Sequence, residues 1–101
     1  ANPTAILAAN DLAALGALQA LFEAGRTVPD DVSLVGYDNA WLAGLQHISL
    51  TPIDQPRHQL GATAVDLLSE RIDGDRRKPK HLVLPPTLVE RSTTAPPSRG
   101  L

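Results

Sequence analysis

Residues 5–37 contain the pattern that most restricts how this chain can fold. The short apolar run AILAA (5–9) is typical of a buried strand. The next segment, DLAALGALQALFEAG (11–25), places apolar residues three and four positions apart and predicts a helix. A second apolar run, VSLVGY (32–37), predicts another strand. A strand, a helix and a strand in this order predict a βαβ unit, with parallel strands and a right-handed crossover.

The signals at the ends of the first helix support this prediction. Asn10 and Asp11 precede the helical pattern, and both residue types are good N-caps. Gly25 follows the pattern and is typical of a helix C-terminus.

The next part of the chain predicts a connector and a second helix. LTPIDQP (50–56) carries two prolines, which favours an extended connector over a core strand. Residues 57–73 have an apolar stripe at helical spacing, and Gly74 ends that pattern. The basic segment DRRKPK (75–80) is interpreted as a solvated turn.

The last part of the chain is rich in proline. HLVL (81–84) and TLVERS (87–92) are strand-like, and the proline pair 85–86 separates them. Such a pair indicates an edge, a bend or a passage between two sheets. The polar tail TTAPPSRGL (93–101) is expected to fray.

Composition and motifs argue against several classes of protein. Eleven acidic and nine basic residues give a net charge of −2, so the chain has no electrostatic footprint for nucleic acid. No apolar run approaches the roughly 18 residues of a membrane span. Without cysteine there is no thiolate metal site, and the three histidines lie far apart. Nucleophile-elbow and phosphate-loop motifs are also missing. We therefore expect no catalytic residue, no metal site and no cofactor.

The start of the chain suggests that it is a fragment. Its first residue is Ala rather than Met, and an apolar strand begins almost at once. We expect a longer parent protein, so the absence of a signal peptide here has no bearing on that parent.

Asn10 and Asp38 are the polar residues that follow the two predicted strands. Parallel strands end at the same edge of a sheet, and ligands of open α/β sheets bind outside that edge. A carboxylate and an amide there would suit a sugar or a similar polyhydroxylated molecule. The alternative is that Asn10 caps the helix and Asp38 begins an Asx-turn. The residue pattern alone leaves both interpretations open.

Several motifs occur in the order found in one family. They are PTAILAAND (3–11), VPDDVSLVGYD (28–38), LTPIDQP (50–56), LGATAVDLL (60–68) and LPPTLVERSTT (84–94). Over residues 3–95 the chain resembles the C-terminal segment of the LacI/GalR family of bacterial transcriptional repressors.

This resemblance implies the type I periplasmic-binding-protein-like α/β fold, with two Rossmann-like subdomains, parallel sheets and three crossover segments, of which only the C-terminal fragment is present. Residues 1–53 would belong to the C-terminal subdomain, and residues 54–85 would cross the hinge into the N-terminal subdomain. Residues 86–95 would return as a strand, and residues 96–101 would form a flexible tail.

The resemblance also implies a sensing role. Asn10, Asp38 and Gln55 match positions where relatives contact a small-molecule effector, here expected to be a sugar or related metabolite. A homodimer is implied, and the expected interface residues are Leu12, Leu15, Gly16, Trp41, Leu42 and Leu45. Operator DNA would be bound only by a helix-turn-helix domain that this chain lacks, and no membrane contact is expected.

The main interpretation is therefore part of a cytoplasmic LacI-type regulator that has no enzyme activity. Two alternatives remain. A periplasmic sugar-binding protein of an ABC transporter shares the fold and would carry a signal peptide upstream. A fragment of an unrelated α/β enzyme would need a nucleophile or cofactor loop that the chain does not show.

Overall fold

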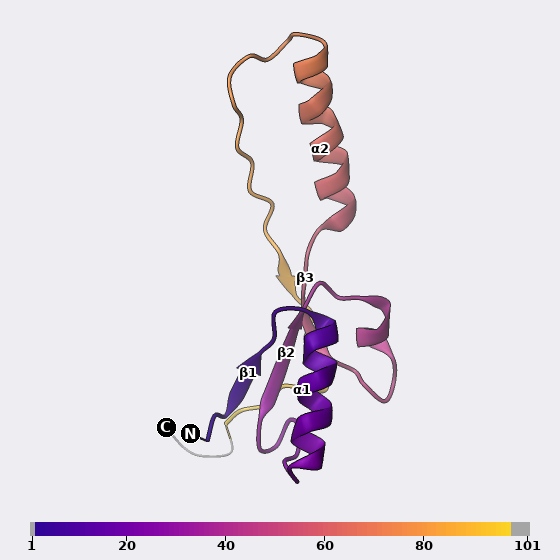
Figure 1. Cartoon of the computed structure of the whole chain (residues 1–101), viewed down its shortest axis with the longest axis vertical. Helices are drawn as coiled ribbons and strands as arrows, with labels where there is room; N and C mark the ends of the chain where they lie inside the picture. The colour runs from indigo at the N-terminus through magenta and orange to yellow at the C-terminus, as the bar shows by residue number, and fades with distance from the viewer. Residues whose placement is uncertain (1, 98–101) are drawn as a thin grey trace. The chain divides into compact units, whose positions relative to one another are not determined.

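The computed structural model describes residues 2–97. The elements follow the order β1, α1, β2, η1, β3, α2, β4 along the chain (Figure 1). Two compact units are present. The first consists of the residues up to Gln55 together with those from Thr87 onward, and the second is Pro56–Pro86.

A four-stranded sheet organises the first unit. Its strands are β1 (Ala5–Leu7), β2 (Ser33–Tyr37), β3 (Thr51–Asp54) and β4 (Thr87–Leu88), and they lie side by side in that order. The pairings β1–β2 and β2–β3 are parallel, whereas β3–β4 is antiparallel. The mixed open sheet agrees with the predicted α/β class.

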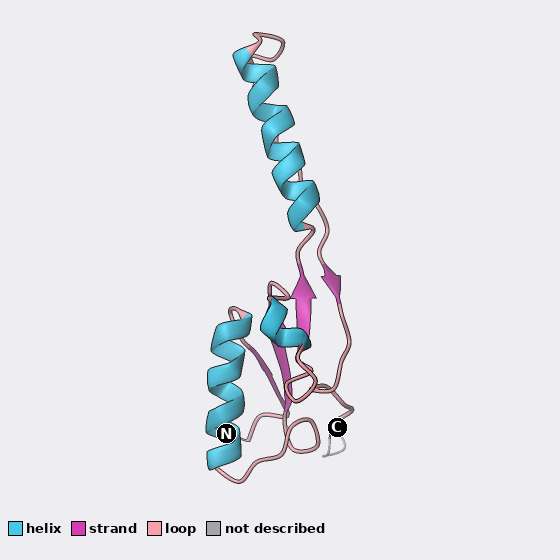
Figure 2. Ribbon diagram, turned by 90° about the vertical axis from the view of Figure 1, so that its right-hand side faces the viewer, coloured by secondary structure: helices cyan, strands magenta, loops and turns pink. Residues whose placement is uncertain are grey.

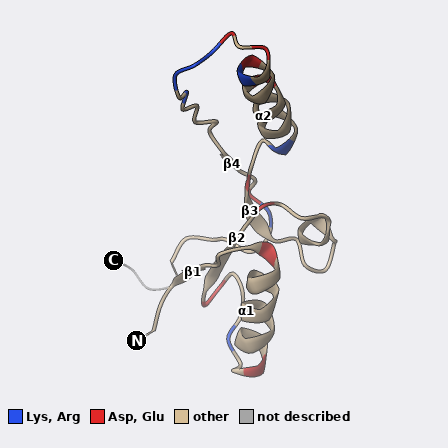
Figure 3. Cartoon of the chain, turned by 45° about the horizontal axis from the view of Figure 1, so that its top comes forward, with Lys and Arg blue, Asp and Glu red and all other residues tan. Residues whose placement is uncertain are grey.

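Helix α1 (Asp11–Glu23) connects the parallel strands β1 and β2, as the predicted βαβ unit requires. The helix begins at the predicted cap, because Asn10 Oδ1 accepts a hydrogen bond from the Ala13 N–H at 2.7 Å. Gly25 follows the helix with φ +73°, a backbone conformation that glycine adopts without steric cost. No charged residue lies between the two ends of α1, and its body is uniformly tan in Figure 3.

The core of this unit is small. Its central cluster of buried apolar residues is Ala14, Leu34, Ala43 and Leu50, which come from α1, from β2, from the 3₁₀ turn η1 (Trp41–Gly44) and from the segment before β3. Figure 2 draws η1 as a short cyan turn. Alanine on α1 and on η1 lets both elements approach the sheet closely.

The segment 50–56 differs from its prediction, because Thr51–Asp54 is a paired strand and not an unpaired connector. Pro52 is tolerated because its backbone carbonyl faces β4 and not β2. Its carbonyl accepts from the Val89 N–H on the β4 side, whereas Ile53 accepts from the Asp38 N–H on the β2 side. The N–H that proline lacks is therefore not needed for pairing with β2.

The return segment after β4 is also more ordered than predicted. Thr93 is only 4% exposed, so the expectation that the tail frays from residue 93 is wrong at its start. Its hydroxyl donates to the Leu34 carbonyl at 2.6 Å and accepts from the Thr51 N–H at 2.9 Å, which links β2 to β3. Residues 98–101 of the expected flexible tail lie outside the described residues.

The second unit contains helix α2 (Arg57–Ile72), which agrees with the predicted helix 57–73. Gly74 follows with φ +78°. The basic turn is held to the helix end, because Arg76 Nε pairs with Glu70 Oε2 at 3.0 Å and its Nη2 donates to the Leu67 carbonyl at 2.9 Å. Figure 3 shows Lys and Arg in blue along this turn.

Residues 81–84 were predicted to be strand-like, and this prediction is wrong for the described structure. They form no strand, and their side chains are largely exposed, with Val83 at 78%. An apolar run needs a neighbouring strand edge to form a ladder. The described residues of the second unit supply only helix α2.

Candidate functional site

An open cleft lies at the carboxyl edge of the parallel strands in the first unit. It has a volume of about 360 Å³ and is lined by Asn10, Asp11, Leu12, Asp38, Ala40 and Leu42. Asn10 follows β1 and Asp38 follows β2, so the parallel pairing brings these two residues to one cleft.

Asn10 has two roles available to it. Its side-chain oxygen caps α1 through Ala13, as the helix-cap interpretation predicted. The residue is exposed at the cleft, and its amide nitrogen remains a donor that can face a ligand. Capping therefore uses the side-chain oxygen and not the amide nitrogen.

Asp38 is held in an uncommon backbone conformation. Its φ is +105°, and Asn39 follows with φ +60°. Asp and Asn tolerate positive φ better than other non-glycine residues do. The Asp38 N–H donates to the Ile53 carbonyl at 2.8 Å. This bond extends the pairing of β2 with β3 and fixes the position of the Asp38 backbone.

Gln55, the third predicted effector residue, contacts Asp38 directly. Its side-chain nitrogen Nε2 donates to Asp38 Oδ1 at 2.6 Å. This hydrogen bond orients the carboxylate. An ionised carboxylate can accept hydrogen bonds at both of its oxygens. Gln55 does not line the cleft itself, and its contact with the site is this bond to Asp38.

Asp11 is predicted from the sequence only as a helix-capping residue, and the structure gives it a different place. It is 2% exposed, and its Oδ2 accepts from the Ala40 N–H at 2.6 Å. Its other oxygen, Oδ1, is buried and has no hydrogen-bond partner among residues 2–97. A Cβ atom at Gly36 would overlap that oxygen, which explains the glycine in the VGYD motif. The sequence signal for this buried acid is an Asp directly after the helix N-cap, together with a glycine late in the next strand.

The residues predicted for a dimer interface do not form one uniform group. Trp41 is 79% exposed, Leu12 is 71% exposed and Leu45 is 44% exposed. Gly16 is exposed as well, whereas Leu15 and Leu42 are half-buried. Leu12 and Leu42 also line the Asn10–Asp38 cleft, so apolar surface adjoins the polar edge.

A second, apolar groove lies along α1. Its volume is about 550 Å³, and it is lined by Leu15, Leu18, Gln19, Phe22 and Ile48. Phe22 is 77% exposed. The groove includes one of the predicted interface residues and extends the exposed apolar surface along the helix.

Within residues 2–97, no group of three or more His, Cys, Asp or Glu side chains is arranged to hold a metal ion. No helix in this part of the chain is long and apolar enough to cross a membrane.

Comparison with known proteins decides the family. A family model described as a periplasmic binding protein-like domain matches residues 1–94. The chain belongs to this family. This assignment confirms the predicted fold class, and the described sheet and helices agree with it.

Similar members of the periplasmic binding protein-like family include transcriptional repressors. The HTH-type transcriptional repressor PurR of Escherichia coli O1:K1 is 44% identical over 94 residues, which are 93% of this chain and 28% of the repressor. The dimeric Lac repressor with an 11-residue C-terminal deletion is 44% identical with a TM-score of 0.84, and the match covers 94% of this chain and 35% of that one.

A third similar structure is a complex of the transcriptional regulator CelR with cellobiose. It is 38% identical with a TM-score of 0.85, and the match covers 91% of this chain and 28% of that one. These relatives are LacI-type regulators, matched over their C-terminal part, which confirms the resemblance drawn from the motifs. The chain spans only about 28% of the repressor's length.

Proposed function

We propose that this chain is the effector-sensing and dimerisation part of a LacI-type, DNA-binding transcriptional regulator. The observation that carries the proposal is the cleft in which Asn10 and Asp38 lie together beside exposed apolar surface. The similarity to repressors favours a regulator over a periplasmic sugar-binding protein of a transporter. A regulator of this kind acts in the cytoplasm and catalyses no reaction.

The proposed ligand is a sugar or a related metabolite with adjacent hydroxyl groups. Asp38 offers a carboxylate to such hydroxyls, and Gln55 holds its Oδ1 in place. The Asn10 amide nitrogen supplies a donor, and Leu12 and Leu42 supply apolar lining. The similarity to a regulator that was solved with cellobiose supports this ligand class.

The proposed mechanism is a shift between two conformations. Residues 1–53 would belong to one subdomain, residues 54–85 would cross into the other, and residues 86–95 would return. An effector that binds one arrangement of the two subdomains more tightly shifts the population toward it. In a dimer, this shift would reset the spacing of two DNA-binding domains that lie outside this chain.

The dimer is proposed to form through Leu12, Leu15, Gly16, Trp41, Leu42 and Leu45. An exposed indole beside exposed leucines is costly to leave in water, and burial contributes about 25 cal/mol per Å² of apolar surface. The similarity to a dimeric Lac repressor supports this proposal.

A thermal-shift screen of the intact natural protein tests the ligand class. Cellobiose, lactose and ribose serve as probes, each at several concentrations, with a sugar-free sample as reference. A sugar that binds only the folded protein raises the free energy of unfolding by about 2.7 kcal/mol when the sugar concentration is 100 times the Kd. We expect a concentration-dependent rise in Tm with at least one sugar. A Tm that stays constant with all three would contradict the proposed ligand class.

A further inference from the structure

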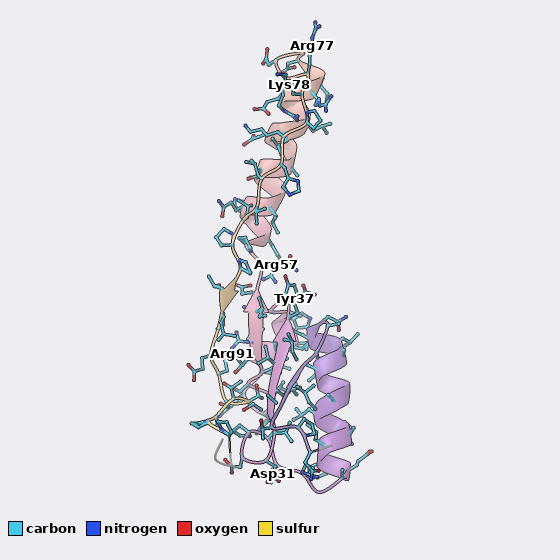
Figure 4. The ribbon with its side chains drawn as sticks, turned by 90° about the vertical axis from the view of Figure 1, so that its left-hand side faces the viewer. Asp31, Tyr37, Arg57, Arg77, Lys78 and Arg91 are labelled. Carbon is cyan, nitrogen blue, oxygen red and sulfur yellow. The ribbon has the colours of Figure 1, made fainter. Side chains whose placement is uncertain are left out.

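Arg91 joins three parts of the first unit. It lies half-buried on the return segment after β4, where Figure 4 labels it. Its backbone N–H donates to Thr51 Oγ1 at 2.9 Å. Its Nη1 donates to the Leu50 carbonyl at 2.9 Å, and its Nη2 donates to Asn39 Oδ1 at 3.0 Å. One side chain therefore connects the return segment, the entry to β3 and the residue that follows Asp38.

The loop that Arg91 reaches is conformationally demanding. Asp38 and Asn39 both have positive φ, and non-glycine residues keep such a conformation only when their surroundings determine it. Several hydrogen bonds hold residues 38–40, which we term the Asp38 loop. The Asp38 N–H donates to Ile53, the Asp38 carboxylate accepts from Gln55, the Ala40 N–H donates to Asp11, and Asn39 accepts from Arg91. The bond to Arg91 engages the side chain of Asn39.

The chemistry of arginine explains why this residue type suits the position. Both acceptors are neutral oxygens, one from a backbone carbonyl and one from a side-chain amide. A planar guanidinium presents several N–H groups in a fixed fork and can bridge two such acceptors. A lysine ammonium is a point charge on a flexible stem, so it replaces the fork poorly.

We infer that Arg91 is a positioning residue of the effector site, which holds the Asp38 loop in its binding conformation through Asn39. Neither Arg91 nor Asn39 lines the cleft, so the effect is indirect. The inference rests on the proposed effector role of Asp38. Its structural content, a loop held by Arg91, can nevertheless be tested without any ligand.

Hydrogen–deuterium exchange of the intact natural protein, measured by mass spectrometry without ligand, tests this inference. A peptide that reports on amides 38–45 is compared with one that reports on amides 12–22 of α1. We expect Arg91→Ala to exchange roughly tenfold faster in the first peptide and to be unchanged in the second. Arg91→Lys should show a smaller increase in the same peptide. Arg77→Ala, which removes an equal charge from the turn after α2, should change neither.

Two results would overturn the inference. One is unchanged exchange of residues 38–45 in Arg91→Ala. The other is an equal increase in both peptides, because general destabilisation would then explain the effect. If Arg91→Ala does not fold, the comparison of Arg91→Lys with the parent decides in the same way. Since no ligand is present, a failure here is distinct from a failure of the proposed sugar binding.

Discussion

At the scale of single residues, the cleft depends on side chains that no ligand needs to touch. Asp11 is buried between Ala40 and Gly36, and its carboxylate ties the start of α1 to the Asp38 loop. A buried carboxylate that accepts too few hydrogen bonds is costly. Gly36 is the complementary feature, because only a residue without Cβ leaves room for that carboxylate.

Gly36→Ala tests this packing. The added Cβ would overlap Asp11 Oδ1 and lie 2.8 Å from Leu50 Cδ2. We expect the free energy of unfolding to fall by about 1–3 kcal/mol, which is the usual cost of overpacking. Urea denaturation of the intact natural protein measures the change.

A double-mutant cycle with Asp11→Ala separates this clash from other effects of the substitution. Without the carboxylate, Gly36→Ala should cost less by at least about 0.5 kcal/mol. Strictly additive losses would show that the two residues are not coupled, and the packing explanation for Gly36 would then be wrong.

The sequence predicted that Asn10 and Asp38 lie at one edge of the sheet, but it did not predict which residues hold that edge in place. The apolar runs predicted two parallel strands, and the edge at which they end follows from that pairing alone. Asp11, Arg91 and Thr93 act through contacts with residues 29 to 59 positions away in the chain. No periodicity or spacing encodes such contacts, because they depend on how separate segments pack.

At the scale of elements, the return segment stabilises the sheet where the pairing of β2 with β3 begins. The Thr93 hydroxyl donates to Leu34 on β2 and accepts from Thr51 on β3, so it replaces a direct ladder bond. Ser33 Oγ adds a reciprocal pair with the backbone of Ala95, with both distances at 3.0 Å. A tail rich in threonine and proline was expected to fray, and only its contacts explain why it starts as an ordered segment.

Thr93→Val should destabilise the protein more than its small change in shape suggests. The substitution leaves the buried Thr51 N–H and the Leu34 carbonyl without the hydroxyl, and each unsatisfied buried group costs about 1–3 kcal/mol. We expect the midpoint of urea denaturation to fall clearly. Thr93→Ser keeps the hydroxyl and serves as the matched control. Equal losses in the two variants would show that the hydroxyl is unimportant.

A second prediction at the scale of elements concerns the exposed apolar residues near η1. Trp41 is 79% exposed and does not line the cleft, so Trp41→Glu should leave folding of the subunit and the polar edge unchanged. In the proposed dimer, the new charge would be buried against a partner, which is strongly unfavourable. We expect sedimentation velocity to show a shift from dimer to monomer.

Gln59→Glu, on exposed α2, introduces the same charge away from that surface and should keep the dimer. A Trp41→Glu variant that remains fully dimeric at micromolar concentration would remove Trp41 from the proposed interface.

At the scale of the whole molecule, the series of family motifs was more informative about the fold than the periodicity of apolar residues. Periodicity predicted the βαβ unit and helix α2, but it missed the pairing of β3, because Pro52 reads as a breaker unless its direction is known. It also predicted a strand at residues 81–84, where the described structure has none. The family assignment rests on motifs from both units, and the comparisons confirm it over residues 1–94.

In the proposed sensor, the polar edge formed after β1 and β2 would receive the ligand, and apolar residues on α1 and η1 would meet a second subunit. Leu12 and Leu42 belong to the cleft and also to the proposed interface. The proposed ligand site and the proposed subunit contact are therefore adjacent in one unit, which would suit a protein whose ligand changes the geometry of a dimer.

Equilibrium titration of the intact natural protein and its Asp38→Asn variant tests whether the Asp38 carboxylate binds the effector. Asparagine tolerates the positive φ at this position and can still accept from Gln55, so the variant removes the charge with little change in the fold. The titrant is the sugar among cellobiose, lactose and ribose that raises the Tm most, and calorimetry gives its Kd. We predict binding roughly 10- to 100-fold weaker, because a hydrogen bond to a charged group contributes about 1.5–3 kcal/mol. An unchanged Kd in the folded variant would contradict the assignment of Asp38 as the sensing acid.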